Sequence, residues 1–496
     1  MSAFDPSETS SASAGSLANF IILRNANHAV MKHYIAVLSN PSQLVDTRPL
    51  RLVIGLAEMG ATRMTLGTAS ALSSQKVSST SYVVCASVLG TAIEWYDFLI
   101  YGTAAALVFN KLFFPIFDPF VGTLAAFGSY AFGFVARPIG GAVIGHFGDR
   151  VGRKGMLVLT MIIMGAATFL IGCLPTYNEI GIWAPILLIT LRFAQGIGIG
   201  GEWCGACVMV IEHARDRRGF YGSLVQMGFP IGVATSTAIF GLMTKLPETS
   251  FESWGWRIPF LVSIVLVLLG VFIRYRLAET PAFQEVVYRN DVVKLPVLEV
   301  IKRDFRSFLL AVGITVSEIA LAYLLTVFTI SYSTTVLGLP RQAILNAIVY
   351  AAGIELITLP LAGWLSDVFG RKALYLTGAL ASIALAFPMF WLFETKNIAI
   401  ITITLVVTMT LTHAFLFGPK AAFMGELFST RVRYSGAALG ANIAAATSGG
   451  FSPLIATALL GWVGTWAVSI FIIVLSLITL VSVLLAPETA RAPLKY

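Results

Sequence analysis

Long apolar runs separated by short polar gaps fill the chain from about residue 82 onward. A transmembrane helix needs about 20 mostly apolar residues, because each residue adds about 1.5 Å toward crossing a hydrocarbon core of about 30 Å. Charges, prolines or glycines occupy each gap between the runs. The pattern predicts an all-α membrane protein with twelve transmembrane helices, at residues 83–108, 121–146, 155–174, 182–211, 219–243, 257–277, 307–332, 343–366, 373–393, 397–424, 433–459 and 462–486.

The composition points to the same class of protein. Hydrophobic residues make up 57% of the 496 residues and charged residues only 12%, whereas soluble chains carry roughly 25% charged residues. The net charge of +8 does not indicate a nucleic-acid partner, because the basic residues recur singly or in small groups between apolar runs. All four cysteines lie within apolar runs, which favours packing over redox or metal chemistry. We expect no cofactor, no metal and no nucleic acid.

Lysines and arginines are concentrated in alternate loops. One set holds Arg150, Arg153 and Lys154, later Arg371 with Lys372, and seven basic residues from Arg274 to Arg306. The other loops hold only isolated ones, at Lys111, Lys245, Arg257, Arg341 and Lys396. Because basic loops stay on the cytoplasmic side, we expect a multi-pass protein of the plasma (inner) membrane with both termini in the cytoplasm.

Residues 1–80 differ from the rest of the chain. They are rich in serine, alanine and threonine, have no run long enough to span, and lack the pattern of a signal peptide. We expect a flexible cytoplasmic tail. The alternative is that translation starts at Met59 or Met64 and that the residues before it are not made.

Two loops repeat each other 218 residues apart, from Asp149 to Asp367. The first reads Gly145-His-Phe-Gly-Asp149-Arg150-Val-Gly152-Arg153-Lys154, and the second reads Gly363-Trp-Leu-Ser-Asp367-Val-Phe-Gly370-Arg371-Lys372. Such self-similarity predicts a duplicated six-helix unit with a binding site between the copies, near the bilayer midplane. We therefore divide the chain into six-helix bundles at 81–277 and 307–489, a cytoplasmic loop at 278–306, and tails at 1–80 and 490–496.

The doubled loop resembles the major facilitator superfamily. Further stretches resemble its metabolite:proton symporter family: Gly90 to Phe98 with Glu94-Trp95-Tyr96-Asp97, Arg137-Pro138 to Gly141, Arg192 to Trp203, Ala278 to Phe283, and Arg431 to Gly436. The resemblance implies proton-coupled uptake of small organic acids or zwitterions, including dicarboxylates, shikimate, aromatic acids, proline and betaine. The coupling ion would be H+.

The resemblance also implies a role for the repeated loop. In the family it latches the cytoplasmic gate shut, which assigns gating to Gly145, Asp149, Arg150, Gly152, Arg153, Lys154, Asp367 and Arg371. Val368 stands where the first copy has Arg150, so we expect the second latch to be the weaker one. Arg137, near the cytoplasmic face, is expected to belong to the gate rather than to the substrate site. The plain alternative for these loops is a topology signal.

Span one carries two acids, Glu94 and Asp97, with Tyr101 on the same face of the helix. A charge at the centre of a span costs roughly 2.5–3.5 kcal/mol on insertion scales, so it usually faces a cavity or a partner. Two carboxylates one turn apart repel each other, so we expect one of them to take up and release a proton near neutral pH. The alternative is a pair of fixed hydrogen bonds between helices.

Other intramembrane charges lie at similar depth. Arg192, with Gln195 on its face, can bind a substrate carboxylate in bidentate fashion or pair with Glu94 or Asp97. Glu318, about 16 Å from the end of its helix by residue rise, and Glu355 are further proton-site candidates. Each of these residues could instead form a fixed ion pair or hydrogen bond.

Span ten holds two more ionisable residues, His413 and Lys420. A lone intramembrane histidine is more often a packing residue than a titrating one, so we favour packing for His413. Lys420 can extend its ammonium group toward the membrane interface. Because the resembling family usually has an uncharged residue here, Lys420 could instead tune substrate choice.

These features favour a monomeric proton symporter that imports a small organic acid across the lipid bilayer by alternating access. The alternatives are a symporter for zwitterions such as proline or betaine, and an exporter on the same fold. Family osmosensors carry a long heptad-patterned tail, whereas nine residues follow Pro487 here, which lowers the zwitterion option. An enzyme is not expected, because we find no nucleophile–base pair, H-E-x-x-H motif or P-loop.

Overall fold

The computed structural model describes residues 80–151, 153–200, 202–213, 216–275, 300, 302, 304–428 and 433–491. In some helical stretches, among them 145–151 and 153–154, it describes the backbone but not the side chains. The predicted tail at 1–80 and most of the predicted loop at 278–306 lie outside the described residues. Residues Ser78–Tyr496 form one compact unit, so the division into two bundles stays a prediction.

Every regular element in the described part of the chain is a helix, which confirms the all-α prediction. The helices of the first half are α3 (Thr80–Ala104), η1 (Ala105–Phe109), α4 (Asn110–Leu112), α5 (Pro119–Val151), α6 (Arg153–Cys173), α7 (Tyr177–Ile180), α8 (Trp183–Ile199), α9 (Glu202–His213), α10 (Arg218–Gln226), α11 (Gly228–Met243), α12 (Glu248–Ser253), η2 (Gly255–Arg257) and α13 (Ile258–Tyr275).

The second half repeats this arrangement of long apolar helices. Its elements are α16 (Phe305–Tyr323), η3 (Leu324–Phe328), α17 (Thr329–Ser331), η4 (Tyr332–Val336), α18 (Arg341–Phe369), α19 (Arg371–Glu394), α20 (Ile398–Thr408), η5 (Met409–Ala414), α21 (Phe415–Leu427), α22 (Arg433–Ala444), η6 (Ala445–Gly449), α23 (Phe451–Trp462) and α24 (Thr465–Leu485).

Ten of the described helical segments are long and apolar enough to cross a membrane. Two shorter apolar helices, Val158–Cys173 and Trp183–Ile199, coincide with the predicted third and fourth spans. Large apolar side chains on the outer faces stay exposed, such as Leu268 at 64% and Ile357 at 69%. A water-soluble surface rarely shows such a belt, whereas hydrocarbon accommodates it. The protein is therefore a multi-pass membrane protein.

Burial separates central helices from outer ones. In the span Val84–Leu112, 94% of the most apolar stretch is buried, and in Phe305–Val336 the share is 78%. In Gly255–Phe272 and Thr465–Leu485 it is only 39%. The helices that carry Glu94, Asp97 and Glu318 are therefore central, and intramembrane charges are expected on such helices rather than on lipid-facing ones.

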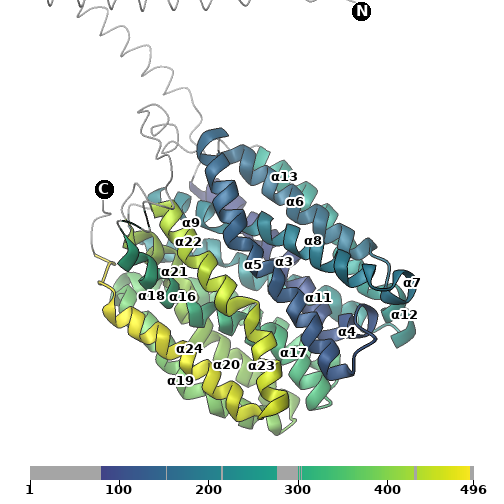
Figure 1. Ribbon diagram of the computed structural model, residues 1–496. Coiled ribbons are helices and arrows are strands. Elements are labelled where there is room, and N and C mark those ends of the chain that lie inside the picture. The colour runs from purple at the N-terminus through teal and green to yellow at the C-terminus, as the bar shows by residue number, and fades with distance from the viewer. Residues whose placement is uncertain are drawn as a thin grey trace, which may run out of the picture. The chain divides into compact units, whose positions relative to one another are not determined.

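The two halves lie side by side (Figure 1). The purple-to-teal helices of the first half gather on one side of the bundle and the green-to-yellow helices of the second half on the other. Two seams join them: α10 and α11 pack against α18 and α21, and α5 packs against α22 and α23. Across the second seam, Asn442 Nδ2 donates to the carbonyl oxygen of Gly200 at 2.6 Å.

Glycines bring α5 and α8 into backbone contact. A Cβ atom added at Gly140 would lie 2.1 Å from the carbonyl oxygen of Ile197, and one added at Gly196 would lie 1.9 Å from that of Gly133. No side chain fits in such a space, so these positions require glycine. The close packing at these glycines sets Arg192 of α8 directly against α5.

Several central spans contain a wider, π-helical turn, a feature often found at functional sites. In span one it is η1 and in span seven η3, at nearly matching places in the repeat, 219 residues apart (Ala105 to Leu324). In span ten it is η5, which carries His413. The π turn changes the directions in which its own side chains and those after it point. It therefore helps set the directions of His413, within the turn, and Lys420, after it.

Candidate functional site

Arg192 is fully buried in the first half, among aromatic rings. Its guanidinium carbon lies 3.8 Å from the ring centre of Phe98, 4.4 Å from that of Tyr101 and 4.5 Å from that of Tyr130. Nη1 donates to Oε1 of Gln195 at 3.0 Å. Nη2 forms no hydrogen bond with any described residue. We call Arg192, Phe98, Tyr101, Tyr130 and Gln195 the arginine cluster.

Local packing holds the arginine cluster in place. Gln195 lies three residues after Arg192, on the same helix face, and donates from Nε2 to Oγ1 of Thr168 at 2.6 Å. Gly133 of α5 makes room for the arginine, since an added Cβ there would lie 2.7 Å from Nε of Arg192. The Tyr101 hydroxyl shares a 2.7 Å hydrogen bond with Oγ of Ser129. The predicted site residues Tyr101, Arg192 and Gln195 are thus brought together.

Glu94 and Asp97 are both buried on α3, with exposures of 4% and 0%. Their helix also carries Phe98 and Tyr101 of the arginine cluster. Among the described residues, Arg192 contacts aromatic rings, the amide of Gln195 and, at 3.5 Å, the carbonyl oxygen of Tyr130. The ion pair of Arg192 with one of these acids stays a prediction.

Four ionisable residues of the second half meet in its interior. Nζ of Lys420 donates to Oε2 of Glu318 at 2.6 Å. His413 Nε2 lies 3.6 Å from Oε1 of Glu318, and its Nδ1 bonds with Oε1 of Glu355. All four side chains are at most 5% exposed. We call Glu318, Glu355, His413 and Lys420 the charge quartet.

The charge quartet also reaches the first half. Nζ of Lys420 lies 4.7 Å from the ring centre of Trp203 on α9 and 5.2 Å from that of Phe417. Trp203 Nε1 donates to Oε1 of Gln226 at 2.7 Å, and Gln226 Nε2 donates to the carbonyl oxygen of Phe417 at 3.4 Å. Lys420 is 4% exposed, and its ammonium is held by Glu318 in the interior instead of extending to the interface.

The sequence contains one signal for the charge quartet, the spacing of His413 and Lys420. His413 and Lys420 are seven residues, or about two helical turns, apart, which puts them on one face of their span. Glu318 and Glu355 lie in two other spans, and only packing brings them to that face. The packing role favoured for His413 is therefore incomplete, because both of its ring nitrogens face carboxylates.

Aromatic rings connect the arginine cluster with the quartet. Tyr323 of α16 lies 5.8 Å from Tyr130 and 6.3 Å from Trp95, measured between ring centres. Trp95 contacts Phe229 at 4.9 Å, and Phe229 lies 4.7 Å from the His413 ring. Residues of both halves form this continuous aromatic wall, which suits the lining of a path for an organic solute.

Arg137 lies beside the same wall. Its guanidinium carbon is 5.7 Å from the ring centre of Phe134 and 5.8 Å from that of Phe98, and its side chain is 9% exposed. A Cβ added at Gly200 would lie 2.1 Å from the carbonyl oxygen of Arg137, so its helix is tightly packed here. The structure thus sets Arg137 near the arginine cluster, and its gating role stays a prediction.

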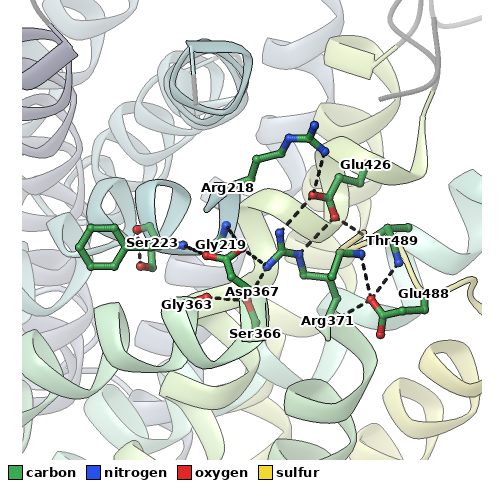
Figure 2. Close-up of polar contacts among 12 residues, drawn as sticks. Arg218, Gly219, Ser223, Gly363, Ser366, Asp367, Arg371, Glu426, Glu488 and Thr489 are labelled. Carbon is green, nitrogen blue, oxygen red and sulfur yellow. Dashed lines mark hydrogen bonds and ion pairs between the residues drawn. The ribbon is translucent and has the colours of Figure 1, made fainter. Parts of the chain in front are cut away.

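The second copy of the repeated loop joins the two halves (Figure 2). The Asp367 carboxylate accepts hydrogen bonds from the backbone N–H groups of Gly219 at 2.8 Å and Phe220 at 2.9 Å. These groups belong to the first turn of α10, where a carboxylate is favoured by the free N–H groups and by the helix dipole. Arg371 donates to Asp367 at 2.7 Å. Asp367 thus caps a helix of the opposite half.

Arg371 is the centre of this network. It is 1% exposed, and its Nε and Nη2 donate to the two oxygens of Glu426, each at 3.2 Å. Such a two-pronged contact is the strongest geometry for an arginine and a carboxylate. Arg218 of the first half lies 3.6 Å from the same carboxylate. We call Asp367, Arg371, Glu426 and Glu488 the latch cluster.

Glu488, beyond the last span, closes the latch cluster (Figure 2). Its Oε1 accepts from the backbone N–H of Arg371 and its Oε2 from that of Lys372, both at 3.0 Å. Burial raises the pKa of Glu488, but the bonds from four backbone N–H groups outweigh it and lower that pKa below its usual value. No gating role was predicted for Glu426 and Glu488, because their partners lie in distant segments. The side chains of Gly145, Asp149, Arg150, Arg153 and Lys154, and all of Gly152, lie outside the described residues.

The halves also touch at the other ends of α11 and α18. Glu248 accepts from Nζ of Lys111 at 2.9 Å and lies 3.5 Å from Nη2 of Arg341. The hydrogen bond to Lys111 and the positive charges nearby lower the pKa of Glu248. Thr244 Oγ1 donates to Oε1 of Gln342 at 3.1 Å. The seam between α10–α11 and α18 is therefore closed at both ends.

Comparisons with known proteins show the family of the chain. The family model of the Major Facilitator Superfamily matches residues 88–450. The chain is 42% identical over 412 residues to the shikimate transporter of Escherichia coli (strain K12), covering 82% of this chain and 94% of that protein. It is 40% identical over 425 residues to the inner membrane metabolite transport protein YhjE of the same strain, covering 84% and 96%.

Two further likenesses are to another transporter and to a solved structure. The chain is 35% identical over 424 residues to the proline/betaine transporter of Salmonella typhimurium, covering 83% of this chain and 84% of that protein. A solved structure of the xylose transporter XylE from E. coli, in a partially occluded inward open conformation, superposes with a TM-score of 0.65. It covers 84% of this chain and 99% of that one at 18% identity, which speaks for the fold alone.

Proposed function

Because the chain belongs to the major facilitator superfamily and is a metabolite transporter, not an enzyme, we propose that it imports a small organic acid together with protons by alternating access. The basic loops and the latch cluster would lie on the cytoplasmic side of the inner membrane. The transported acid would bind between the two halves, where the aromatic wall is built from both.

Arg192 carries the proposal. A buried guanidinium stays charged and is costly to hold away from water unless a partner compensates it. The rings of the arginine cluster supply part of that compensation through cation–π contacts. Nη2 forms no hydrogen bond with any described residue, so the group retains a donor for an acceptor from outside the protein. A substrate carboxylate has the charge and geometry to take that bond.

The same cluster favours an acid over a zwitterion. A quaternary or secondary ammonium group is usually held over the faces of aromatic rings. In the arginine cluster, the faces of Phe98, Tyr101 and Tyr130 already lie against the Arg192 guanidinium. An added cation there would be repelled by the arginine. Proline and betaine, which carry such a cation, are therefore the second candidate class.

Proton coupling rests on the buried acids. Glu94 and Asp97 lie on the helix that carries Phe98 and Tyr101 of the arginine cluster, and Glu318 and Glu355 belong to the charge quartet. Buried acids within membrane spans typically mark ion pathways and proton relays in transporters. Alternating access would open one end of the seam between α10–α11 and α18 while the other stays closed.

The test is uptake into proteoliposomes under an inward-directed proton gradient. Radiolabelled shikimate, succinate, benzoate, proline and betaine are compared, with the interior kept neutral. We expect an acidic exterior to stimulate accumulation of at least one acid, and a protonophore to abolish it. Arg192→Gln should remove uptake at unchanged expression, and Arg491→Gln, on the exposed C-terminal side, is the matched control.

Three outcomes would overturn the proposal. If acidic pH stimulates none of the acids, proton-coupled acid import is wrong. If only proline or betaine is accumulated, the zwitterion alternative holds. Net efflux of preloaded acid against its gradient in cells would indicate an exporter.

A further inference from the structure

The charge quartet contains a cation that acid binding at Arg192 does not use. Lys420 is buried, and its ammonium is bonded to Oε2 of Glu318 at 2.6 Å. Its other close neighbours are the rings of Trp203 and Phe417. A lysine ammonium is a compact point charge. Among the described residues, Glu318 supplies the carboxylate that pairs with it.

The charges of the quartet balance. With His413 protonated, two carboxylates face one ammonium and one imidazolium, so the sum is zero. One more proton leaves an excess positive charge in the protein interior, where an uncompensated charge is costly. An anion from outside the protein would offset it. Proton uptake by the quartet and anion binding next to it therefore favour each other, as linkage requires.

His413 gives the quartet a route for that proton. One of its ring nitrogens bonds with Glu355 and the other lies 3.6 Å from Glu318. Oε2 of Glu355 forms no hydrogen bond with any described residue, so it can accept a proton. Passing a proton from Glu355 through the imidazole to Glu318 neutralises the carboxylate that holds Lys420.

The other titratable groups near Glu318 do not control the bond between Lys420 and Glu318. Tyr323 of α16 and Tyr375 of α19 interact electrostatically with Glu318, and both phenols are neutral near physiological pH. From the first half, Trp203 of α9 contacts the lysine and Gln226 of α10 is hydrogen-bonded to Trp203, and neither side chain titrates. The side chain of Glu202 lies outside the described residues.

Lys420 and Arg192 are too far apart to hold one small acid together. Arg192 lies seven residues, or about 10 Å of helix rise, before the end of α8 at Ile199, and Trp203, the ring beside Lys420, belongs to the next helix, α9. Lys420 lies toward the end of the bundle that carries the latch cluster, because Glu426 is on the same helix six residues later. The two cations are therefore successive positions along one path.

We propose that Lys420 is a second anion-binding group on the path between Arg192 and the latch cluster, held by Glu318 until the quartet takes up a proton. The proposal rests on the proposed function, acid transport with protons. Protonation of Glu318 frees the ammonium, which attracts the substrate carboxylate from Arg192. Loss of that proton at the latch end restores the Lys420–Glu318 bond and releases the anion.

Binding measurements on the purified protein test this with isosteric changes. Radiolabelled shikimate is the first probe and succinate and benzoate the others, each at about pH 5.5 and about pH 8, because proton uptake linked to anion binding makes affinity depend on pH. Glu318→Gln mimics the protonated acid. We expect it to raise affinity at the higher pH about tenfold and to remove the pH dependence, since a hydrogen bond to a charged group contributes about 1.5–3 kcal/mol.

Lys420→Met should have the opposite effect. We expect affinity at the lower pH to fall about tenfold, again with the pH dependence lost. The double variant, which removes both charges, should behave like Lys420→Met and guards against a folding defect of either single change. Glu394→Gln and Lys245→Met, whose side chains are not buried, are the matched controls.

The opposite effects of Glu318→Gln and Lys420→Met on anion affinity distinguish this role from that of a structural ion pair. A structural pair would lower thermal stability in both variants and leave anion affinity and its pH dependence as in the wild type, and that result overturns the proposal. If Arg192→Gln abolishes binding while Glu318→Gln leaves affinity unchanged, acid transport stands and the role of Lys420 falls. If the wild type binds none of the acids, both fall together.

Discussion

The arginine cluster and the charge quartet each bury a cation, and they compensate it differently. Around Arg192 the partners are rings, an amide and a carbonyl, which carry no charge to gain or lose. Around Lys420 the partner is the Glu318 carboxylate, and His413 lies between that carboxylate and Glu355. The first arrangement holds a fixed positive charge at any physiological pH. The second changes its charge with a single proton, which makes it the region suited to coupling.

The two regions also differ in how they are built. The arginine cluster is formed by helices of the first half, mainly α3, α5 and α8. The quartet belongs to the second half but touches the first through Trp203 and Gln226. A rocking movement of the halves would leave most contacts of Arg192 intact and would change the surroundings of Lys420. Each prediction below tests this contrast, beginning with the largest expected effect.

Crowding Arg192 without removing its charge should have the largest effect. A Cβ at Gly133 would lie 2.7 Å from Nε of Arg192, so Gly133→Ala displaces the guanidinium from its rings. We expect acid uptake to fall about a hundredfold, in line with the loss of a well-placed charged contact. The measurement is the uptake rate in proteoliposomes. Gly128→Ala, where an added Cβ meets nothing within 4 Å, is the matched control. Normal uptake by Gly133→Ala would show that the exact position of Arg192 is unimportant.

Weakening the latch cluster should affect the charge quartet more than the arginine cluster. Asp367→Asn removes the negative charge that caps α10 and pairs with Arg371. Caps and helix-end charges contribute about 0.5–2 kcal/mol, so we expect the maximal uptake rate to change by about three- to tenfold. KM for the acid should change less, because Arg192 lies elsewhere. A large rise in KM with an unchanged maximal rate would contradict the separation of the two regions. Asp118→Asn, outside the latch, is the control.

Removing the exposed ion pairs of Glu248, at the end of the seam away from the latch cluster, should have the smallest effect on uptake. Glu248 is 61% exposed and pairs with Lys111 and Arg341, and exposed pairs contribute little. We expect Glu248→Gln to change uptake by less than about twofold. A tenfold loss would mean that this end of the seam, near neither cation, limits transport.

The pH dependence of the same contact has a definite sign. The pKa of Glu248 is lowered in the folded protein, so its contribution to stability is present above the ordinary glutamate range and is lost as pH falls below it. The thermal unfolding temperature of Glu248→Gln should therefore differ most from that of the wild type near neutral pH. The difference should vanish on acidification. A difference that grows at low pH would contradict the lowered pKa.

Much of the site could be predicted one helix at a time. The cost of burying charge marked Glu94, Asp97, Arg192, Glu318 and Glu355 as residues with a role, and all five are buried. Helical spacing also joined Arg192 with Gln195, which are hydrogen-bonded. These inferences worked because they depend only on a residue's own span and on the 3.6-residue period.

Contacts between spans could not be obtained in this way. His413 and Glu355 are 58 residues apart, and Lys420 and Glu318 are 102 apart. The period of a helix shows which residues share a face but not which neighbour that face meets. The favoured packing role for His413 followed from treating it alone. The contact of Asp367 with the first turn of α10, 148 residues away, depends on the same kind of information.

The sequence by itself determined the membrane-spanning helices, the repeated loop and the list of buried charges, because apolar length and charge burial are properties of local composition. Only the tertiary structure decided how the charges are compensated. It set Arg192 among rings, bound Lys420 to Glu318 through a contact between two spans, and placed Glu426 and Glu488 around Arg371. The physical reason is that a side chain's electrostatic partner is chosen by helix packing, which brings distant segments within hydrogen-bond distance.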